Sequence, residues 1–398
     1  MFRSTNAYRK ISRGYSKNFP EYLAFRYKRY PEFVYDQRPK PLKNEIPVFT
    51  LHSVEPTRFE EQLEYLSKNG YQTTDADHLY EFIAGIKPVP EQTIVLTFDD
   101  GWRNLWDVVY PLLKKYKFQA VSFIIPGLIK ETDIDHTNIE PLCTWQEIKI
   151  MHENKTIDFQ SHTMYHSLIY TSPEIEDFVN PSFDYHKMNF NVPLFLDNGM
   201  EMISRKAELG MPIYENAPRF SGKNRYFDDA GIRKLCIEHV KHNGGVGFFK
   251  KPFWRKTLND IVSEYRKIHA TTGYYESEQE KEEKLYTDLL ESKKTIERKL
   301  PRKIVSHLGY PWWVGSDLAI EISKKAGYRT NFWGVIEERR TTNRAGDDPY
   351  RISRLLGDEC IFRLPGKGRK SLRKIMKEKF IINYMRLMKG FASSNKNF

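Results

Sequence analysis

The chain has 398 residues, 40% of them hydrophobic, and a formal net charge of +11. This length and composition predict a globular protein with one large domain or two ordinary ones. No run reaches the roughly 20 apolar residues that cross a bilayer, and the N-terminal sequence lacks the apolar stretch of a secretory signal, so we expect a cytoplasmic protein. Three cysteines, far apart and outside any CxxC pattern, argue against a disulfide framework and a thiolate metal site.

The positive charge lies at the two ends of the sequence. Residues 1–44 hold eleven Lys or Arg against three acids, and residues 367–398 hold ten against one. The middle is mildly acidic, which argues against a nucleic-acid groove through the fold. The basic, aromatic-rich residues 1–44 and the basic amphipathic helix predicted at 361–398 fit an anionic membrane surface, which would place the protein at the inner face of the membrane. Solvated ends, or docking of this helix on the protein, are the alternatives.

Short apolar runs with strand character alternate with helical patterns. We predict strands at 46–54, 93–101, 120–127, 156–162, 304–311 and 328–335. Helical spacing of apolar residues predicts helices at 56–70 and 316–328, each ending near a glycine. Because strands that alternate with helices form parallel sheets through crossovers, the sequence predicts an α/β fold with a closed or nearly closed β/α barrel at 45–170 and 285–360.

Residues 171–284 interrupt this alternation. They contain few clean strand signals, many aromatic residues and clusters typical of loops, and a charged helix is predicted after them at 276–300. We expect an insertion that folds over the barrel mouth. A second subdomain with a purely structural role is the alternative.

Reactive side chains fall at the predicted strand ends. The segment TIVLTFDDGW brings Asp99 and Asp100 to the end of one strand, while His52, His162 and the GYPWW segment at 309–313 follow others. In β/α barrels the carboxyl ends of the strands carry the chemistry, so we expect these residues to converge.

Four positions separate His162 and His166 in QSHTMYHSL, so one helical turn or a compact loop can aim both imidazoles at one point. Two imidazoles and one carboxylate make a three-ligand site for a divalent metal, with positions left for water and substrate. The second carboxylate of the DD pair can then act as a base toward a metal-activated water. Alone, DDG is typical of a turn; its pairing with HxxxH favours the metal site.

The motifs TFDDG and SHTMYH resemble the first two motifs of the polysaccharide deacetylases, the NodB-homology metal-dependent carbohydrate esterases. The resemblance covers about 45–170 and 290–356. It implies a distorted, partly open β/α barrel with a large insertion, and hydrolysis of an N-acetyl group, less often an O-acetyl or N-formyl group, from a sugar. It also implies that Asp99 is the general base and that a metal, usually Zn²⁺, is held by Asp100, His162 and His166.

The acid that protonates the departing amine is expected to be His52. Many family members carry this histidine in a late LH motif, but no histidine follows His307 in this chain. The segment PVFTLHSV resembles the YHxV opening of the permuted branch that includes the poly-N-acetylglucosamine deacetylases, in which the first strand supplies the acid. His307, just before GYP, is the competing candidate, and a core histidine at a strand end is the structural alternative for His52.

The third motif departs from the forms common in the family. Pro311 of GYPWW matches, but Gly309 stands where one form has its arginine, so the charge that orients the base is expected from Arg351 or Arg354, unless these form surface salt bridges. By the same resemblance, the backbone N–H of the residue after the proline is an oxyanion donor. The expected oxyanion and substrate residues are Trp312, Tyr310 and Trp313, with core packing as the alternative for the aromatic rings.

Together these features predict a Zn²⁺- or other divalent-metal-dependent hydrolase that removes an N-acetyl group from a saccharide or sugar-containing precursor of a cell-envelope glycan. Deformylation or other amide hydrolysis on an amino sugar is the alternative reaction. A catalytically silent carbohydrate-binding protein is the alternative of another class, although a pure binder has no need of the base.

Overall fold

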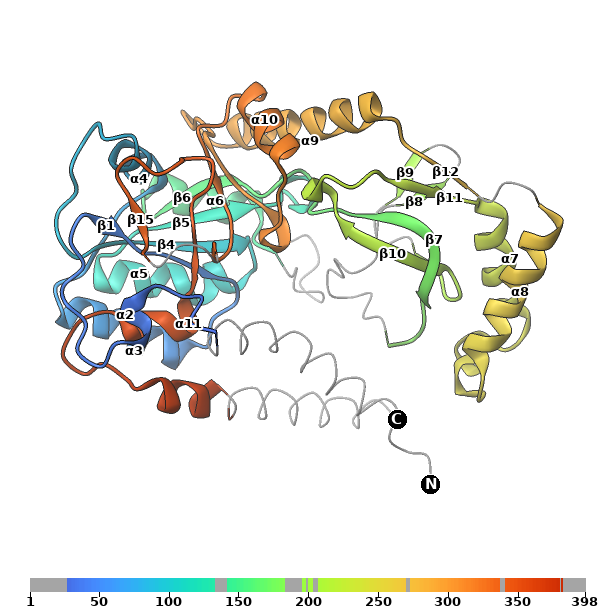
Figure 1. Ribbon diagram of the computed structural model, residues 1–398, viewed down its shortest axis with the longest axis horizontal. Helices are drawn as coiled ribbons and strands as arrows, with labels where there is room; N and C mark the ends of the chain where they lie inside the picture. The colour runs from blue at the N-terminus through green and yellow to red at the C-terminus, as the bar shows by residue number, and fades with distance from the viewer. Residues whose placement is uncertain are drawn as a thin grey trace.

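The structure is a computed structural model that describes residues 27–132, 142–182, 195–197, 200–202, 207–269, 273–336, 341–379 and 381. The described residues form a barrel-like α/β domain and an elongated insertion that extends from one side of it (Figure 1). Helix α9 (Glu278–Lys299) runs from the insertion back along the barrel.

A parallel sheet forms the centre of the barrel. In spatial order its strands are β14 (Thr330–Phe332), β13 (His307–Gly309), β6 (Ile157–Ser161), β5 (Ala120–Ile124), β4 (Thr93–Asp100), β2 (Val48–Leu51) and β16 (Leu355–Leu356). The short β3 (Gln72–Thr73) pairs with the start of β4, and β1 (Glu45–Ile46) pairs antiparallel with β15 (Asn343–Arg344) outside the sheet. All strands of the sheet except β3 and β16 lie within the predicted strand segments.

Residues 349–356 bring the two edges of the sheet together. Ile352 forms an isolated parallel bridge with Phe332 of β14, and Leu355 then pairs with Phe49 of β2. Because the join to β14 is a single bridge, the closure is partial. The prediction of a distorted, partly open β/α barrel with an insertion is therefore confirmed.

Helices pack around the sheet. They include α2 (Glu32–Tyr35), α3 (Pro56–Lys68), α4 (Ala76–Ile83), α5 (Tyr110–Tyr116), α6 (Trp145–Glu153), α10 (Asp317–Lys325) and α11 (Gly357–Cys360). Helices α3 and α10 lie where the sequence predicts them. Glu55 caps α3 by accepting two backbone N–H bonds, and Ser316 caps α10. Buried side chains of these helices share one hydrophobic cluster with the strands.

The insertion has more strand than its sequence suggests. Its strands form three antiparallel pairs: β7 (Leu168–Phe178) with β10 (Pro212–Pro218), β8 (Phe195–Asp197) with β9 (Met200–Met202), and β11 (Tyr226–Asp228) with β12 (Gly273–Tyr275). Helices α7 (Ala230–His242) and α8 (Trp254–Ile268) lie farthest from the barrel (Figure 1). These elements bury hydrophobic clusters separate from that of the barrel, so the insertion has its own core.

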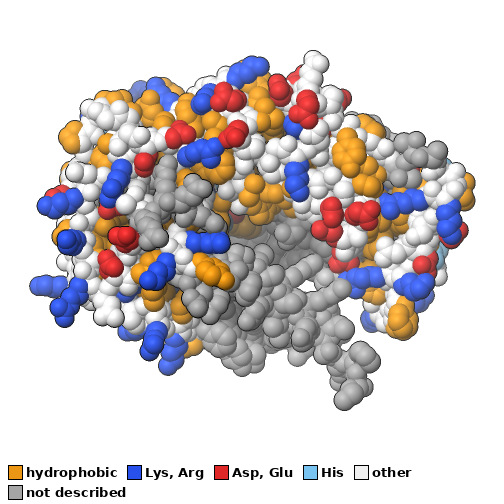
Figure 2. Space-filling view, viewed as in Figure 1, with side chains coloured by type: hydrophobic (Ala, Val, Ile, Leu, Met, Phe, Trp, Pro, Cys, Tyr) orange, Lys and Arg blue, Asp and Glu red, His pale blue; other side chains and the backbone are white. Residues whose placement is uncertain are grey.

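The two ends of the described chain meet on the barrel. Residues 372–379 are helical, Ile375 is fully buried, and Arg58 of α3 pairs with Glu378 at 2.9 Å. The side chain of Arg363 donates to the backbone carbonyls of Val34 and Asp36. Lys and Arg side chains remain numerous on this lower left part of the barrel, over α2 and α3 (Figure 2). The described part of the predicted C-terminal helix thus docks on the barrel, while 1–26 and 382–398 lie outside the described residues.

None of the described helices combines the length and the apolar character that a membrane span requires. The three cysteines are buried and unpaired with one another, as the sequence predicts.

Candidate active site

The two adjacent carboxylates sit where β4 ends. All eight residues of β4 are buried, and side chains alternate between the two faces along a strand. Asp100 then has a φ of 73° and Gly101 a φ of 77°, so the backbone leaves the strand at the second carboxylate. This turn separates the directions of the two side chains, and Asp99 and Asp100 have different partners.

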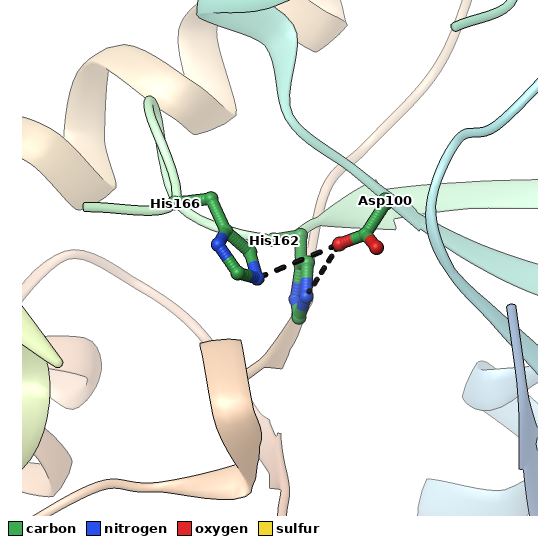
Figure 3. A group of neighbouring side chains, drawn as sticks. All are labelled: Asp100, His162 and His166. Carbon is green, nitrogen blue, oxygen red and sulfur yellow. Dashed lines mark ion pairs between the residues drawn. The ribbon is translucent and has the colours of Figure 1, made fainter. Parts of the chain in front are cut away.

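Asp100, His162 and His166 converge on one point (Figure 3). Oδ1 of Asp100 lies 3.4 Å from Nε2 of His162 and 3.5 Å from Nε2 of His166. His162 follows β6, and His166 lies four residues farther along the loop that leads to β7. All three residues are buried, and they follow the ends of β4 and β6, the parallel strands on either side of β5, as the prediction of convergence at strand ends requires.

The donor set of this group fits a divalent cation. Nδ1 of His162 lies 2.7 Å from the carbonyl oxygen of Gly309, which can only accept, so Nδ1 carries a proton and Nε2 is the ring nitrogen that faces Asp100. Oδ1 of Asp100 is buried, and no hydrogen bond from a described residue reaches it. Ligand atoms about 2.0–2.2 Å from a tetrahedral ion lie about 3.3–3.6 Å from one another, which matches the separations found.

Burial and charge set the protonation of these ligands. Burial opposes ionisation of Asp100, but its contacts with His162 and the nearby His52 and His166 outweigh burial and lower the pKa of the carboxyl. Burial lowers the pKa of His166 to about 3, against the opposing pull of the Asp100 carboxylate. A carboxylate beside a neutral imidazole is the form in which both bind a cation.

Neighbouring groups hold each ligand in place. The indole N–H of Trp102 donates to Oδ2 of Asp100 at 2.8 Å. In the histidine loop, the backbone N–H of His166 donates to Oγ1 of Thr163, and that of Met164 donates to Asp288 of α9 at 2.8 Å. Supporting groups of this kind orient metal ligands and tune their affinity.

Backbone strain concentrates at the same place. Five residues of the site have positive φ values although none is a glycine: Asp100, Thr163, His166, Trp312 and Trp313. Such conformations are costly for ordinary side chains and persist only where the surroundings impose them, often at functional sites.

Asp99 contacts Arg354. Nη1 of Arg354 donates to Oδ1 of Asp99 at 2.6 Å, and both side chains are almost completely buried. Burial opposes ionisation of Asp99, but Arg354, with His162 and His52, outweighs burial and lowers the pKa of this carboxyl. Arg351 lies elsewhere: it pairs with Asp317 at 2.6 Å on the surface. Of the two predicted arginines, Arg354 is the one that reaches Asp99.

His52 and His307 have contrasting surroundings. His52 is exposed just beyond the end of β2, and its ring lies edge-on to Trp313 with a centroid distance of 6.5 Å. His307 is fully buried at the start of β13, where its ring nitrogens contact Thr330 at 2.7 Å and Asp77 at 3.1 Å. The ring of His307 therefore contacts Thr330 and Asp77 and not Asp100, whereas His52 lies beside Trp313.

The aromatic residues of GYPWW divide between site and core. The ring of Trp312 lies 4.0 Å from that of His166, and Trp313 lies beside His52. Tyr310 is fully buried, and its hydroxyl accepts a hydrogen bond from Asn331 at 2.8 Å. Trp312 and Trp313 thus border the site, whereas the Tyr310 side chain belongs to the core.

A family model described as polysaccharide deacetylase matches residues 86–184, the segment that carries both aspartates and both metal-motif histidines. This matched segment, about a quarter of the chain, is similar to polysaccharide deacetylases. The matched segment does not include His52, Trp312 or Arg354, which tertiary structure adds to the site.

Curated relatives carry a more specific name. The poly-beta-1,6-N-acetyl-D-glucosamine N-deacetylase of Escherichia coli strain K12 is 30% identical over 118 residues, which are 28% of this chain and 18% of that protein. The protein of the same name from Staphylococcus aureus strain MSSA476 is 29% identical over 113 residues, 28% of this chain and 37% of that protein. The chain therefore spans well under half the length of these relatives. A solved structure of a de-N-acetylase from Aggregatibacter actinomycetemcomitans has 19% identity and a TM-score of 0.49, and the alignment covers 78% of this chain and 94% of that one.

Sequence reasoning missed several groups that support the site. Trp102 stands in the quoted segment TIVLTFDDGW, and a half-buried indole N–H needs an acceptor, so the signal was present. Asp288 lies among many charges on a helix, where no pattern distinguishes it. The carbonyl of Gly309 acts through the backbone, which residue identity does not report.

Proposed function

We propose that the chain is a divalent-metal-dependent hydrolase that removes an N-acetyl group from a saccharide of the cell envelope or from a precursor of it. The observation that carries this proposal is the convergence of a three-ligand group with a second, separate carboxylate. Asp100, His162 and His166 offer one ligand atom each, while Asp99 is held ionised by Arg354 beside them.

In this proposal Asp99 is the general base. Oδ1 accepts the short hydrogen bond from Arg354 at 2.6 Å, whereas Oδ2 has a long contact with the hydroxyl of Thr50 at 3.5 Å, so Oδ2 is the oxygen that takes a proton from the attacking water. The lowered pKa keeps the carboxyl ionised and ready to accept the proton near neutral pH.

His52 is the proposed general acid. Amide hydrolysis breaks the C–N bond, and the nitrogen must take a proton because an amine anion is a poor leaving group. His52 is exposed beside the site, whereas both ring nitrogens of His307 are engaged by Thr330 and Asp77. His52 therefore supplies that proton, and the products are acetate and a free amine.

Asp100, His162 and His166 are the proposed ligands of the metal. A bound divalent ion would supply Lewis acidity that activates water and polarises the acyl carbonyl. Two imidazoles and a carboxylate suit Zn²⁺, which we propose as the native ion.

The backbone N–H of Trp312 is the proposed oxyanion donor, and Trp312 and Trp313 are proposed to contact the sugar. Both residues border the group of ligands and His52. The names of the relatives favour a poly-β-1,6-N-acetylglucosamine-like substrate. A cytoplasmic location and contact of the basic ends with an anionic membrane remain predictions.

The test is acetate release by the purified full-length chain. The substrates are β-1,6-linked N-acetylglucosamine oligomers and the monosaccharide, each with added Zn²⁺ and after chelation. We expect metal-dependent acetate release that is lost in Asp99→Asn. Formate release from N-formyl amino sugars, without acetate release, would support the deformylase alternative. Saccharide binding without any hydrolysis would support the silent binding protein and overturn the proposal.

A further inference from the structure

The two carboxylate oxygens of Asp100 have different surroundings. Oδ1 faces Nε2 of His162 at 3.4 Å and Nε2 of His166 at 3.5 Å. Oδ2 accepts a hydrogen bond from Nε1 of Trp102 at 2.8 Å. One oxygen therefore points at the ligand group, and the other is engaged by an indole that can only donate.

A carboxylate can bind a cation through one oxygen or through both. A hydrogen bond to one oxygen favours binding through the other, since that oxygen would have to give up its donor to bind the ion. Binding through a single oxygen also leaves more of the coordination sphere for water and substrate, which a catalytic site requires.

We propose that Trp102 is a positioning residue that keeps Asp100 a one-oxygen metal ligand and thereby sets the affinity and coordination number of the site. This inference rests on the proposed function, because it assumes that the group of Asp100, His162 and His166 holds a divalent ion. In this inference Trp102 acts through its hydrogen bond to Asp100.

The backbone around Trp102 is fixed well enough for this role. Trp102 forms an antiparallel bridge with Leu142, and the backbone N–H of Cys143 donates to the carbonyl of Gly101 at 2.9 Å. Gly101 has a φ of 77°, and a Cβ there would lie 3.0 Å from the side chain of Ile124. The chain therefore turns sharply and closely past β5, and this turn aims the indole back at Asp100.

The test compares Trp102→Phe with the wild-type chain. Phenylalanine keeps an aromatic ring and removes the N–H. Binding of Zn²⁺ and Co²⁺ to the metal-free protein is measured by competition with a chromogenic chelator, and the absorption spectrum of the Co²⁺ form is recorded. We expect affinity to fall about 10- to 100-fold, as for other groups that orient metal ligands. We also expect the visible Co²⁺ bands to weaken, because four-coordinate Co²⁺ absorbs more strongly than higher coordination and Asp100 becomes free to bind through both oxygens.

Trp106→Phe is the matched control. Trp106 lies four residues along the chain, is half-buried and stacks on Tyr110 at 5.4 Å, away from Asp100. This variant should bind Co²⁺ with wild-type affinity and spectrum. Trp102→Leu, which has no polar hydrogen in its side chain, replaces Trp102→Phe if the latter fails to fold.

Unchanged Co²⁺ affinity and spectrum in a folded Trp102 variant would overturn the inference. These readouts need no substrate, so they remain decisive if the chain hydrolyses some other amide or none. If the wild-type chain binds neither Zn²⁺ nor Co²⁺, the metal-dependent function itself fails and this inference fails with it.

Discussion

The barrel and the insertion both bury charged side chains, but they satisfy them differently. In the insertion, buried or half-buried charges face opposite charges: Arg219 pairs with Glu276, and Arg255 pairs with Asp177 at 2.9 Å. At the barrel mouth, Oδ1 of Asp100 faces two imidazole nitrogens, Nε2 of His162 at 3.4 Å and Nε2 of His166 at 3.5 Å. In the insertion each of these charges meets a single opposite charge, whereas at the barrel mouth one atom from each of three side chains converges on one point. This convergence, more than burial of charge, distinguishes the candidate site.

Helix α9 connects the two regions. Near its start, the Nζ of Lys281 donates to the carbonyl of Gly222 and to Asn224 in the insertion. Two turns later, Asp288 accepts from the backbone N–H of Met164 between the two histidines, and Ser292 contacts Ser161 at 2.7 Å. Helix α9 therefore contacts both the insertion and the loop that carries His162 and His166. Substitutions along α9 test whether the two regions depend on each other.

The largest expected effect follows removal of a ligand. Asp100→Ala, His162→Ala and His166→Ala should each abolish stoichiometric metal binding and hydrolysis, since two protein ligands remain. Metal content is measured by elemental analysis of the purified protein. Asp177→Ala, which breaks an ion pair of the insertion, is the control and should keep the metal. Stoichiometric metal in His162→Ala would show that this group does not bind the metal, and the barrel mouth would then not differ from the insertion in this respect.

The next largest effect distinguishes the roles of the two adjacent carboxylates. Asp99→Asn should keep the metal and lose about 10²- to 10⁴-fold in turnover, as expected for loss of a general base. Turnover and metal content are measured on the same preparation. If Asp99→Asn loses the metal while Asp100→Asn keeps it, the assigned roles are reversed.

The third prediction tests the acid. His52→Ala should retain metal and substrate binding but lose about 10²-fold or more in turnover, with a change in the limb of the pH–rate profile that reports the acid. His307→Asn is the comparison, because both ring nitrogens of His307 are engaged by Thr330 and Asp77. Normal turnover in His52→Ala with loss in His307→Asn would transfer the role to His307.

A smaller effect is expected at the boundary between the regions. Asp288→Ala frees the Met164 N–H and loosens the histidine loop, so metal affinity should fall about 10-fold without loss of folding. Glu291→Ala, an exposed α9 residue paired with Lys294, is the control. Chelator competition measures both variants. Equal affinity in the two would mean that α9 supports the insertion alone.

The smallest expected effects are changes in folding stability with pH. They have opposite signs for one buried aspartate of the insertion and one aspartate of the barrel. In the insertion, burial raises the pKa of Asp228 despite Arg233 and Arg225, so its contribution to stability is present at low pH and is lost as pH rises from the ordinary Asp range through the raised value. In the barrel, the hydrogen bond from His307 lowers the pKa of Asp77 against burial. That contribution is present above the ordinary Asp range and is lost as pH falls through the lowered value.

Thermal unfolding of Asn variants checks these signs. Relative to wild type, Asp228→Asn should gain Tm between about pH 3.5 and about pH 7, and Asp77→Asn should lose Tm over the same interval. Tm changes of the same sign in both variants would contradict the opposite pKa shifts of Asp228 and Asp77.

Part of the fold was predictable because its determinants are local. Strand β4 is a run of eight buried residues, and α10 begins at a serine whose side chain caps it. The strands of the insertion escaped prediction because β8, β9, β11 and β12 have only three residues each and alternate too briefly to be recognised. The two-residue strand β16, which closes the barrel, has no periodicity at all.

The sequence by itself determined which reactive residue types gather at the candidate site: TFDDG and SHTMYH bring two carboxylates and two imidazoles to the ends of β4 and β6. Tertiary structure decided which other residues meet them. Arg354 rather than Arg351 reaches Asp99 across a separation of 255 residues, and the side chain of Tyr310 turns into the core while Trp312 lies against His166. Local patterns reflect propensity and periodicity, whereas contacts between distant segments depend on how the barrel closes.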